Sequence, residues 1–200
     1  MDVRDKILLA AVTVFAEVGF RGATTRRIAQ EAGVNEITLF RHFGSKDRLL
    51  HEAISRSDLA PTPPALPSEP RRPRAELLAW VKEHYEHLVQ RRSLICTCLA
   101  EMSEHPEIIP PNNPTALAVE QLGDYLRKLR SAGFTNVTFD AEIAAPMLLG
   151  VLFSDAMGRE FAPGAYPKEP DKTLEGYVDF FLRGLGVEKH AAGIRQEKAS

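Results

Sequence analysis

The chain has 200 residues, 44% of them apolar and 26% charged, with a formal net charge of −2. This composition is ordinary for a folded protein of one or two domains with a hydrophobic core. No run approaches the roughly eighteen apolar residues that a membrane span needs, and MDVRDKILLAAV carries charges where a signal peptide would carry its apolar region. We therefore expect a cytoplasmic protein.

Four helices are predicted in the first 55 residues, because apolar side chains recur at three-and-four spacing. They lie near 3–18, 25–32, 35–43 and from 45 onward. Asp2 and Ser45 are suited to cap helix starts, and Gly19 and Gly33 are suited to end helices. Residues 1–55 are therefore predicted to form a small N-terminal domain that extends into the start of the fourth helix.

A proline-rich segment follows. Six prolines lie between Pro61 and Pro73, and each lacks a backbone donor and disfavours helical geometry in the residue before it. We therefore predict that residues 56–74 hold the end of the fourth helix and a semi-rigid linker.

Longer helices without a basic cluster are predicted beyond the linker. They lie near 75–90, 93–104, 114–132, 140–160 and 171–185. Asn113 with Pro114 marks one helix start, and Pro146 requires that its helix either kinks or begins there. Residues 75–188 are predicted to form a larger helical domain, and 189–200 a flexible tail. The predicted fold class is all-α, with about nine helices.

The two short helices between residues 25 and 43 form a helix-turn-helix pattern. Two helices joined by a tight turn that contains Gly33, with a short second helix, are typical of this motif. Leu39 and Phe43 are the expected inward anchors of the second helix. Its outer face carries Glu36, Ile37, Phe40 and Arg41, with Thr38 and His42 at the edges. Such a face can enter the major groove of DNA and read base edges.

Basic residues flank this short helix. Between Arg21 and Arg48, six basic side chains accompany three acidic ones, although the whole chain is slightly acidic. Thr25 with Arg26, and Lys46 at the start of the fourth helix, offer two sites for DNA phosphates. The alternative is an ordinary solvated face, but the joint order of these residues favours DNA binding.

The same segment carries a family resemblance. The motifs are Thr24-Thr25, Ile28-Ala29, Ala32-Gly33-Val34, Thr38-Leu39-Phe40, His42-Phe43, Ser45-Lys46 and Leu49. Over its first 55 residues the chain resembles the TetR (tetracycline-repressor) family of bacterial transcription regulators. The remainder resembles that family in its all-helical architecture.

The resemblance implies a homodimer that binds a near-palindromic operator in double-stranded DNA and releases it when a small, hydrophobic effector binds. The family's DNA contacts fall on Thr25, Arg26, Glu36, Ile37, Thr38, Phe40, Arg41, His42 and Lys46. Phe40 replaces the family's usual tyrosine and removes a phosphate hydrogen bond worth about 0.5–1.5 kcal/mol. Glu36 is penalised near phosphates but can accept a hydrogen bond from a cytosine amino group.

Two further sites are expected in the second domain. Residues that line an effector pocket, or else form plain core, are Trp80, Tyr85, Leu99, Met102, Tyr125, Met147 and Phe153. The helix at 140–160 is apolar around most of its circumference, which favours a dimer interface over a central helix buried in one subunit. The expected interface residues are Ile143, Leu148, Val151, Tyr177 and Phe181.

No catalytic, metal or cofactor site is predicted. His84 and His87 lie one helical turn apart but lack a complete ligand set, and Cys96 and Cys98 are expected to be reduced core thiols. The sequence has no GxSxG, P-loop or dinucleotide motif. We therefore predict a ligand-responsive repressor. The alternatives are a redox- or metal-responsive regulator with the same fold, and a helical carrier or enzyme without DNA binding.

Overall fold

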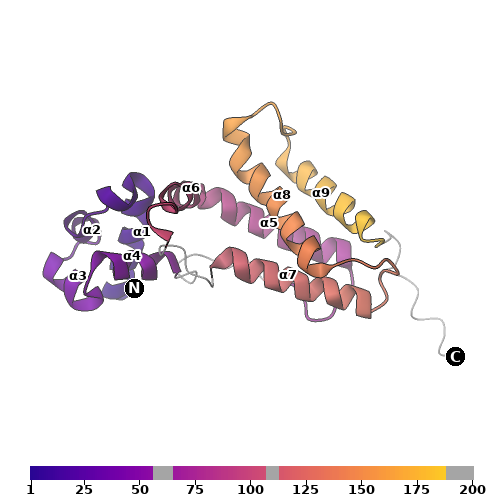
Figure 1. Cartoon of the computed structure of the whole chain (residues 1–200), viewed down its shortest axis with the longest axis horizontal. Helices are drawn as coiled ribbons and strands as arrows, with labels where there is room; N and C mark the ends of the chain where they lie inside the picture. Colours follow the sequence, from indigo (N-terminus) through magenta and orange to yellow (C-terminus); the bar gives the residue numbers. More distant parts are fainter. Residues whose placement is uncertain (56–64, 107–112, 188–200) are drawn as a thin grey trace. The chain divides into compact units, whose positions relative to one another are not determined.

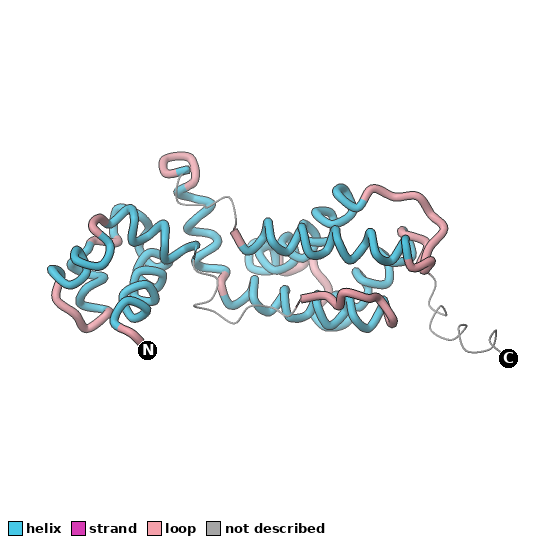
Figure 2. The backbone as a smooth tube through the Cα atoms, turned by 90° about the horizontal axis from the view of Figure 1, so that it is seen from below, coloured by secondary structure: helices cyan, strands magenta, loops and turns pink. Residues whose placement is uncertain are grey.

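The computed structural model describes residues 1–55, 65–106 and 113–187. Within these ranges it holds nine α-helices and no strand, which confirms the all-α class (Figures 1 and 2). The helices are α1 (Val3–Gly22), α2 (Thr25–Glu31), α3 (Glu36–Phe43), α4 (Lys46–Ser55), α5 (Pro73–Gln90), α6 (Arg92–Glu101), α7 (Pro114–Ser131), α8 (Ala141–Phe161) and α9 (Pro170–Gly184). The predicted tail, and the predicted linker as far as residue 64, lie outside the described residues.

Local capping explains where α1 begins and ends. The Asp2 carboxylate accepts a hydrogen bond from the Val3 N–H, so Asp2 is the predicted N-cap. Gly19, the predicted end of the helix, adopts φ 68° and interrupts the helical backbone, but α1 continues beyond it to Gly22. Residues with a Cβ rarely adopt this backbone conformation, so the break requires glycine.

The first compact unit contains α1–α4 together with α6. Its core is a cluster of apolar side chains from α1–α4, in which Phe15, Ile28, Leu39 and Leu50 are fully buried. Burial of these side chains is the main force that holds the short helices α2 and α3, because helices of their length are marginal alone.

Helix α6 packs on α1 in this first unit. Leu94 and Cys98 of α6 join the same buried cluster, and the hydroxyls of Ser93 and Thr97 each donate to the Ala16 carbonyl at 3.1 Å. The sequence prediction had assigned this helix to the second domain, 75–188. The difference arises because one buried face on so short a helix does not reveal which core it joins.

The second compact unit contains α5 and α7–α9. Trp80 and Tyr125 are its largest buried side chains, and Leu122, Leu126 and Leu152 are fully buried around them. Figure 1 shows α8 and α9 running side by side, joined by a loop at one end.

Helix α8 begins at Ala141, with the Asp140 carboxylate accepting from the Glu142 N–H. The alternative in which this helix begins at Pro146 is therefore wrong, and the proline lies within it. By length and composition, α8 is the one described helix that could cross a membrane, with a mean hydropathy of 1.3. Half of that apolar window is buried inside the protein.

Candidate nucleic-acid interface and effector domain

The turn between α2 and α3 is set by three local signals. Thr24 caps α2 by accepting from the Arg27 N–H, and Asn35 caps α3 by accepting from the Ile37 N–H at 2.9 Å. Between them Gly33 has φ 66°, and the Val34 N–H donates back to the Ala29 carbonyl at 2.9 Å. This bond pattern ends a helix at a glycine and turns the chain sharply. The predicted helix-turn-helix is confirmed.

The two faces of α3 differ in exposure as its sequence predicts. Leu39 is fully buried and Phe43 is 4% exposed, so both anchor the helix on the first unit's core. On the outer face Ile37 is 75% exposed and Phe40 is 46% exposed, although both are large and apolar. Burying these side chains would release free energy, so their exposure marks a surface suited to a partner.

The polar residues predicted to contact DNA are exposed or half-buried. Arg26 on α2, and Arg41 and His42 on α3, are exposed, whereas Glu36 and Thr38 are half-buried. The structure thus brings all the predicted contact positions onto α2, α3 and the first residue of α4.

Lys46 has a structural role that the sequence did not indicate. Its ammonium donates to the Phe20 carbonyl at 2.8 Å and lies 4.0 Å from the centroid of the Phe20 ring. An ammonium has three N–H donors, so two remain for a phosphate. The Phe20 N–H in turn donates to the Glu101 carboxylate at 2.9 Å, which ties the turn after Gly19 to the end of α6.

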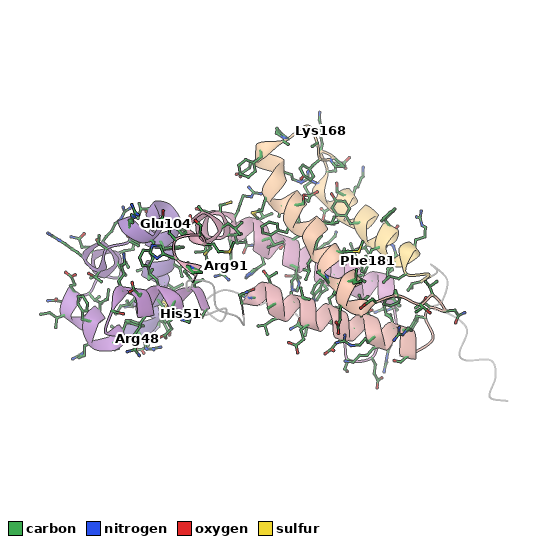
Figure 3. The ribbon with its side chains drawn as sticks, viewed as in Figure 1. Arg48, His51, Arg91, Glu104, Lys168 and Phe181 are labelled. Atoms are coloured by element: carbon green, nitrogen blue, oxygen red, sulfur yellow. The ribbon has the colours of Figure 1, made fainter. Side chains whose placement is uncertain are left out.

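A groove of about 600 Å³ borders the C-terminal end of α3. Its lining is Arg4, His42, Phe43, Asp47, Arg48, His51, Glu52 and Ser55, and Figure 3 labels Arg48 and His51 on α4. Arg4 is paired with Glu52, and its guanidinium lies 5.1 Å from the Phe43 ring centroid. Asp47 offsets the charge of Arg48. The groove therefore has little net charge apart from its two histidines.

The predicted effector residues are divided between the two compact units. In the second unit Trp80, Tyr85 and Tyr125 are buried, Phe153 is half-buried, and Met147 is 62% exposed on the surface of α8. Leu99 and Met102 belong to the first unit and are about half exposed, at 46% and 47%.

Trp80 lies on α5 beside His84. Its indole Nε1 is the single buried side-chain nitrogen or oxygen without a hydrogen-bond partner in the described part of the chain. The His84 ring lies 3.7 Å from the Trp80 ring, centroid to centroid, and its Nδ1 hydrogen-bonds the Trp80 carbonyl at 2.9 Å. Burial lowers the pKa of His84. A buried N–H without a hydrogen-bond partner costs about 1–3 kcal/mol, and most buried polar groups have a partner in the protein or an ordered water.

Asp155 is the charged centre of the second unit, and the sequence analysis did not single it out. Its carboxylate is fully buried and accepts from the hydroxyls of Tyr85 on α5 and Tyr177 on α9, each at 2.8 Å. Arg159, one turn along α8, donates through Nε at 2.5 Å and Nη2 at 3.0 Å. The i,i+4 spacing of these two charges in an apolar helix was the available signal.

The surface of α8 and α9 holds an apolar groove with a volume of about 850 Å³. Its lining includes Met147, Val151, Tyr177, Phe180 and Phe181, the last of which Figure 3 labels. Phe180 is 78% exposed.

The predicted interface residues differ in exposure. Ile143 and Val151 are 60% and 42% exposed, Tyr177 and Phe181 are half-buried, and Leu148 is 2% exposed. Leu148 therefore packs within its own unit.

Two observations concern the metal and redox alternatives. No group of three potential metal-ligating side chains occurs within the described ranges. Burial raises the pKa of the Cys98 thiol to about 11, so little of the reactive thiolate exists at neutral pH.

Comparison with known proteins gives a consistent result. Residues 7–53 match the family model described as bacterial regulatory proteins, tetR family. The chain is 24% identical to the HTH-type transcriptional regulator YvkB of Bacillus subtilis, over 92% of this chain and 97% of that protein. It is 42% identical to the repressor AcnR of Corynebacterium efficiens over 60 residues, which are 30% of this chain and 31% of that protein.

Among solved structures, the SmeT–triclosan complex has the same fold. It superposes with a TM-score of 0.67 at 22% identity, covering 91% of this chain and 90% of that one.

Proposed function

The chain belongs to the TetR family of bacterial regulatory proteins, a family of transcriptional regulators rather than enzymes, and from this we propose that it is a dimeric, ligand-released repressor. The observation that carries the proposal is the outer face of α3. Ile37 and Phe40 are exposed there beside Arg41, on a helix whose opposite face is anchored by buried side chains. The DNA major groove accepts a single short helix and contacts its outer face, so it fits this arrangement.

In this proposal α3 reads base edges and Lys46 contacts a phosphate. Arg41 can donate two parallel hydrogen bonds to a guanine edge, the commonest specific contact to a base. The Phe20 carbonyl holds the Lys46 ammonium in place, so less side-chain entropy is lost when a phosphate binds. The repressor AcnR, which is 42% identical to this chain over 60 residues, supports repression as the direction of regulation.

We further propose that the α8–α9 groove is the dimer interface. Exposed Met147, Val151 and Phe180 give this groove an apolar surface that monomeric proteins rarely leave open. A twofold dimer would present two α3 helices to operator half-sites about one DNA turn apart, ~34–36 Å, or a multiple of it.

Replacing Arg41 with alanine tests the proposed DNA contact. Operator affinity is expected to fall by about 1–3 kcal/mol per subunit, because a bidentate base contact is lost while the fold is untouched. Fluorescence anisotropy with a duplex selected by the wild-type protein from a random library measures this. Lys128→Ala, which removes an exposed cation from α7, is the matched control and should bind as the wild type does. Equal affinity of the wild type and Arg41→Ala would refute the proposed contact.

The effector is proposed to be a small hydrophobic molecule that carries a hydrogen-bond acceptor. The orphaned Trp80 Nε1 supports this acceptor, and the triclosan complex of SmeT shows that a protein of this fold binds a hydrophobic phenol. The chain has a single tryptophan, so its fluorescence reports on Trp80 alone.

Hydrophobic phenols and ketones that raise the melting temperature are therefore expected to change Trp80 emission as well. Thermal shift, intrinsic fluorescence and release of the selected duplex measure the three effects on one sample. A compound that stabilises the protein and releases DNA without altering Trp80 emission would contradict the proposal that the effector binds beside Trp80.

A further inference from the structure

The first residues of α2 and α3 are joined by one side-chain hydrogen bond. The Thr25 hydroxyl donates to the Glu36 carboxylate at 2.5 Å, and both residues are half-buried. The bond crosses the turn between the two helices and holds a carboxylate at the N-terminal end of α3. Of the predicted DNA-contact residues, Glu36 is the only one with a negative charge.

This bond removes Thr25 from the set of phosphate donors. A threonine hydroxyl has one O–H donor, and here it is directed to Glu36. A DNA phosphate diester carries no proton and can only accept hydrogen bonds. The Thr25 hydroxyl therefore cannot donate to a phosphate while it holds Glu36.

The same bond fixes the position of the carboxylate. A free glutamate side chain rotates about several bonds, and ordering it on binding costs conformational entropy. With one oxygen held by Thr25, the carboxylate still has lone pairs that can accept from a donor on the DNA. In the major groove, cytosine N4 presents such a donor, and the pairing of glutamate with this amino group is geometrically suitable.

We propose that Glu36 is a specificity-determining residue that accepts a hydrogen bond from a cytosine amino group, and that Thr25 is its positioning residue. The proposal rests on the proposed DNA-binding function and adds the base that is read. The negative charge repels phosphates on every sequence, and only the operator with cytosine at the right position compensates it. Such a pair weakens binding to wrong sites more than to the correct one.

Three variants separate the reading role from the positioning role. Glu36→Gln keeps the size of the side chain and removes its charge. Thr25→Val keeps the shape of the side chain and removes the hydroxyl, and Thr25→Ser keeps the hydroxyl and is the matched control. Each variant is assayed by anisotropy on three duplexes: the selected operator, the operator with the read cytosine replaced, and an unrelated sequence.

The wild type is expected to prefer the cytosine operator by about 5- to 150-fold. Glu36→Gln should lose part of this preference, because its amide keeps an acceptor oxygen but not the charge, and it should bind the unrelated duplex more tightly. Thr25→Val should lose part of the preference, and Thr25→Ser should keep it. Melting temperatures of all variants report whether the fold is kept, and a fold effect alone would not change the ratio between duplexes.

The outcomes distinguish the two levels of the hypothesis. Unchanged base preference in Glu36→Gln would overturn the reading role, and unchanged preference in Thr25→Val would overturn the positioning role. In both cases Arg41→Ala should still bind poorly. If Arg41→Ala also binds like the wild type, the proposed DNA contact itself fails.

Discussion

Replacement of Asp155 by asparagine is expected to lower the free energy of unfolding by about 3 kcal/mol, because it leaves Arg159 without its buried counter-ion. This value is at the lower end for a broken buried ion pair, because the Arg159 side chain is 18% exposed and water can partly solvate its charge. The variant also weakens the acceptor shared by Tyr85 and Tyr177, so contacts that join α5, α8 and α9 are lost together. Urea denaturation should show a lower midpoint with an unchanged slope.

Asp124→Asn is the matched control for this prediction. Asp124 pairs with Arg127 on the surface of α7, where the two side chains are 55% and 47% exposed. Exposed pairs contribute about 0–1 kcal/mol, so this variant should unfold almost as the wild type does. Equal destabilisation by the two substitutions would show that the Asp155 cluster has no special role.

The contribution of Asp155 should also depend on pH. Burial raises the pKa of this carboxyl, but the hydrogen bonds from Arg159, Tyr177 and Tyr85 outweigh burial and lower its pKa overall. A carboxyl with a lowered folded-state pKa stabilises the protein above the unfolded value of about 3.9, and this stability is lost as the pH falls through the folded value. The difference between wild type and Asp155→Asn should therefore be constant near neutral pH and shrink in acid.

Substitution of Met147 by aspartate is expected to dissociate the proposed dimer. Met147 lines the α8–α9 groove and is 62% exposed in the monomer, so the new carboxylate should change monomer stability by only about ±0.5 kcal/mol. In the dimer the same carboxylate would be buried without a partner, which is strongly unfavourable. Light scattering after size-exclusion chromatography should give the mass of one chain instead of two.

Loss of the dimer should reduce operator affinity by about 10²–10⁴-fold, because the two reading helices no longer bind as one unit. Phe161→Asp provides the control: Phe161 is 80% exposed on the same helix but is not in the groove lining. If Met147→Asp stays dimeric, or if both variants dissociate alike, the groove is not the interface.

The helix-turn-helix could be predicted from sequence because its signals are local. Asn35 caps α3 by accepting from an N–H two residues away, and Gly33 supplies the positive φ that the turn needs at its own position. The roles of Thr25 and Lys46 could not be predicted, because their partners Glu36 and Phe20 lie 11 and 26 residues away. Only the packing of helices decides which distant groups meet.

The second unit shows the same limit. The apolar pattern of α8 predicts that more than one face of this helix is buried. Ile143 and Val151 are exposed in the single chain, so their face of α8 is open to a partner. The i,i+4 spacing of Asp155 and Arg159 could indicate an ion pair within α8, but it does not show that Tyr85, 70 residues away in the chain, joins that pair. Pocket residues are harder to predict, because a buried aromatic side chain such as Trp80 or Tyr125 has the same sequence pattern whether it fills the core or lines a pocket.

The contact between Glu101 and Phe20 means that the proposed DNA-binding unit, α1–α4 with α6, is discontinuous along the chain. A fragment cut after residue 55 would lack Glu101, and it would uncover the apolar surface that Leu94 and Cys98 close. A hybrid regulator made by joining α1–α4 of this protein to the rest of another family member would place Phe20 against the α6 of that other protein. Transfer of the proposed DNA-binding unit therefore requires α6 as well as α1–α4, as two separate segments of the chain.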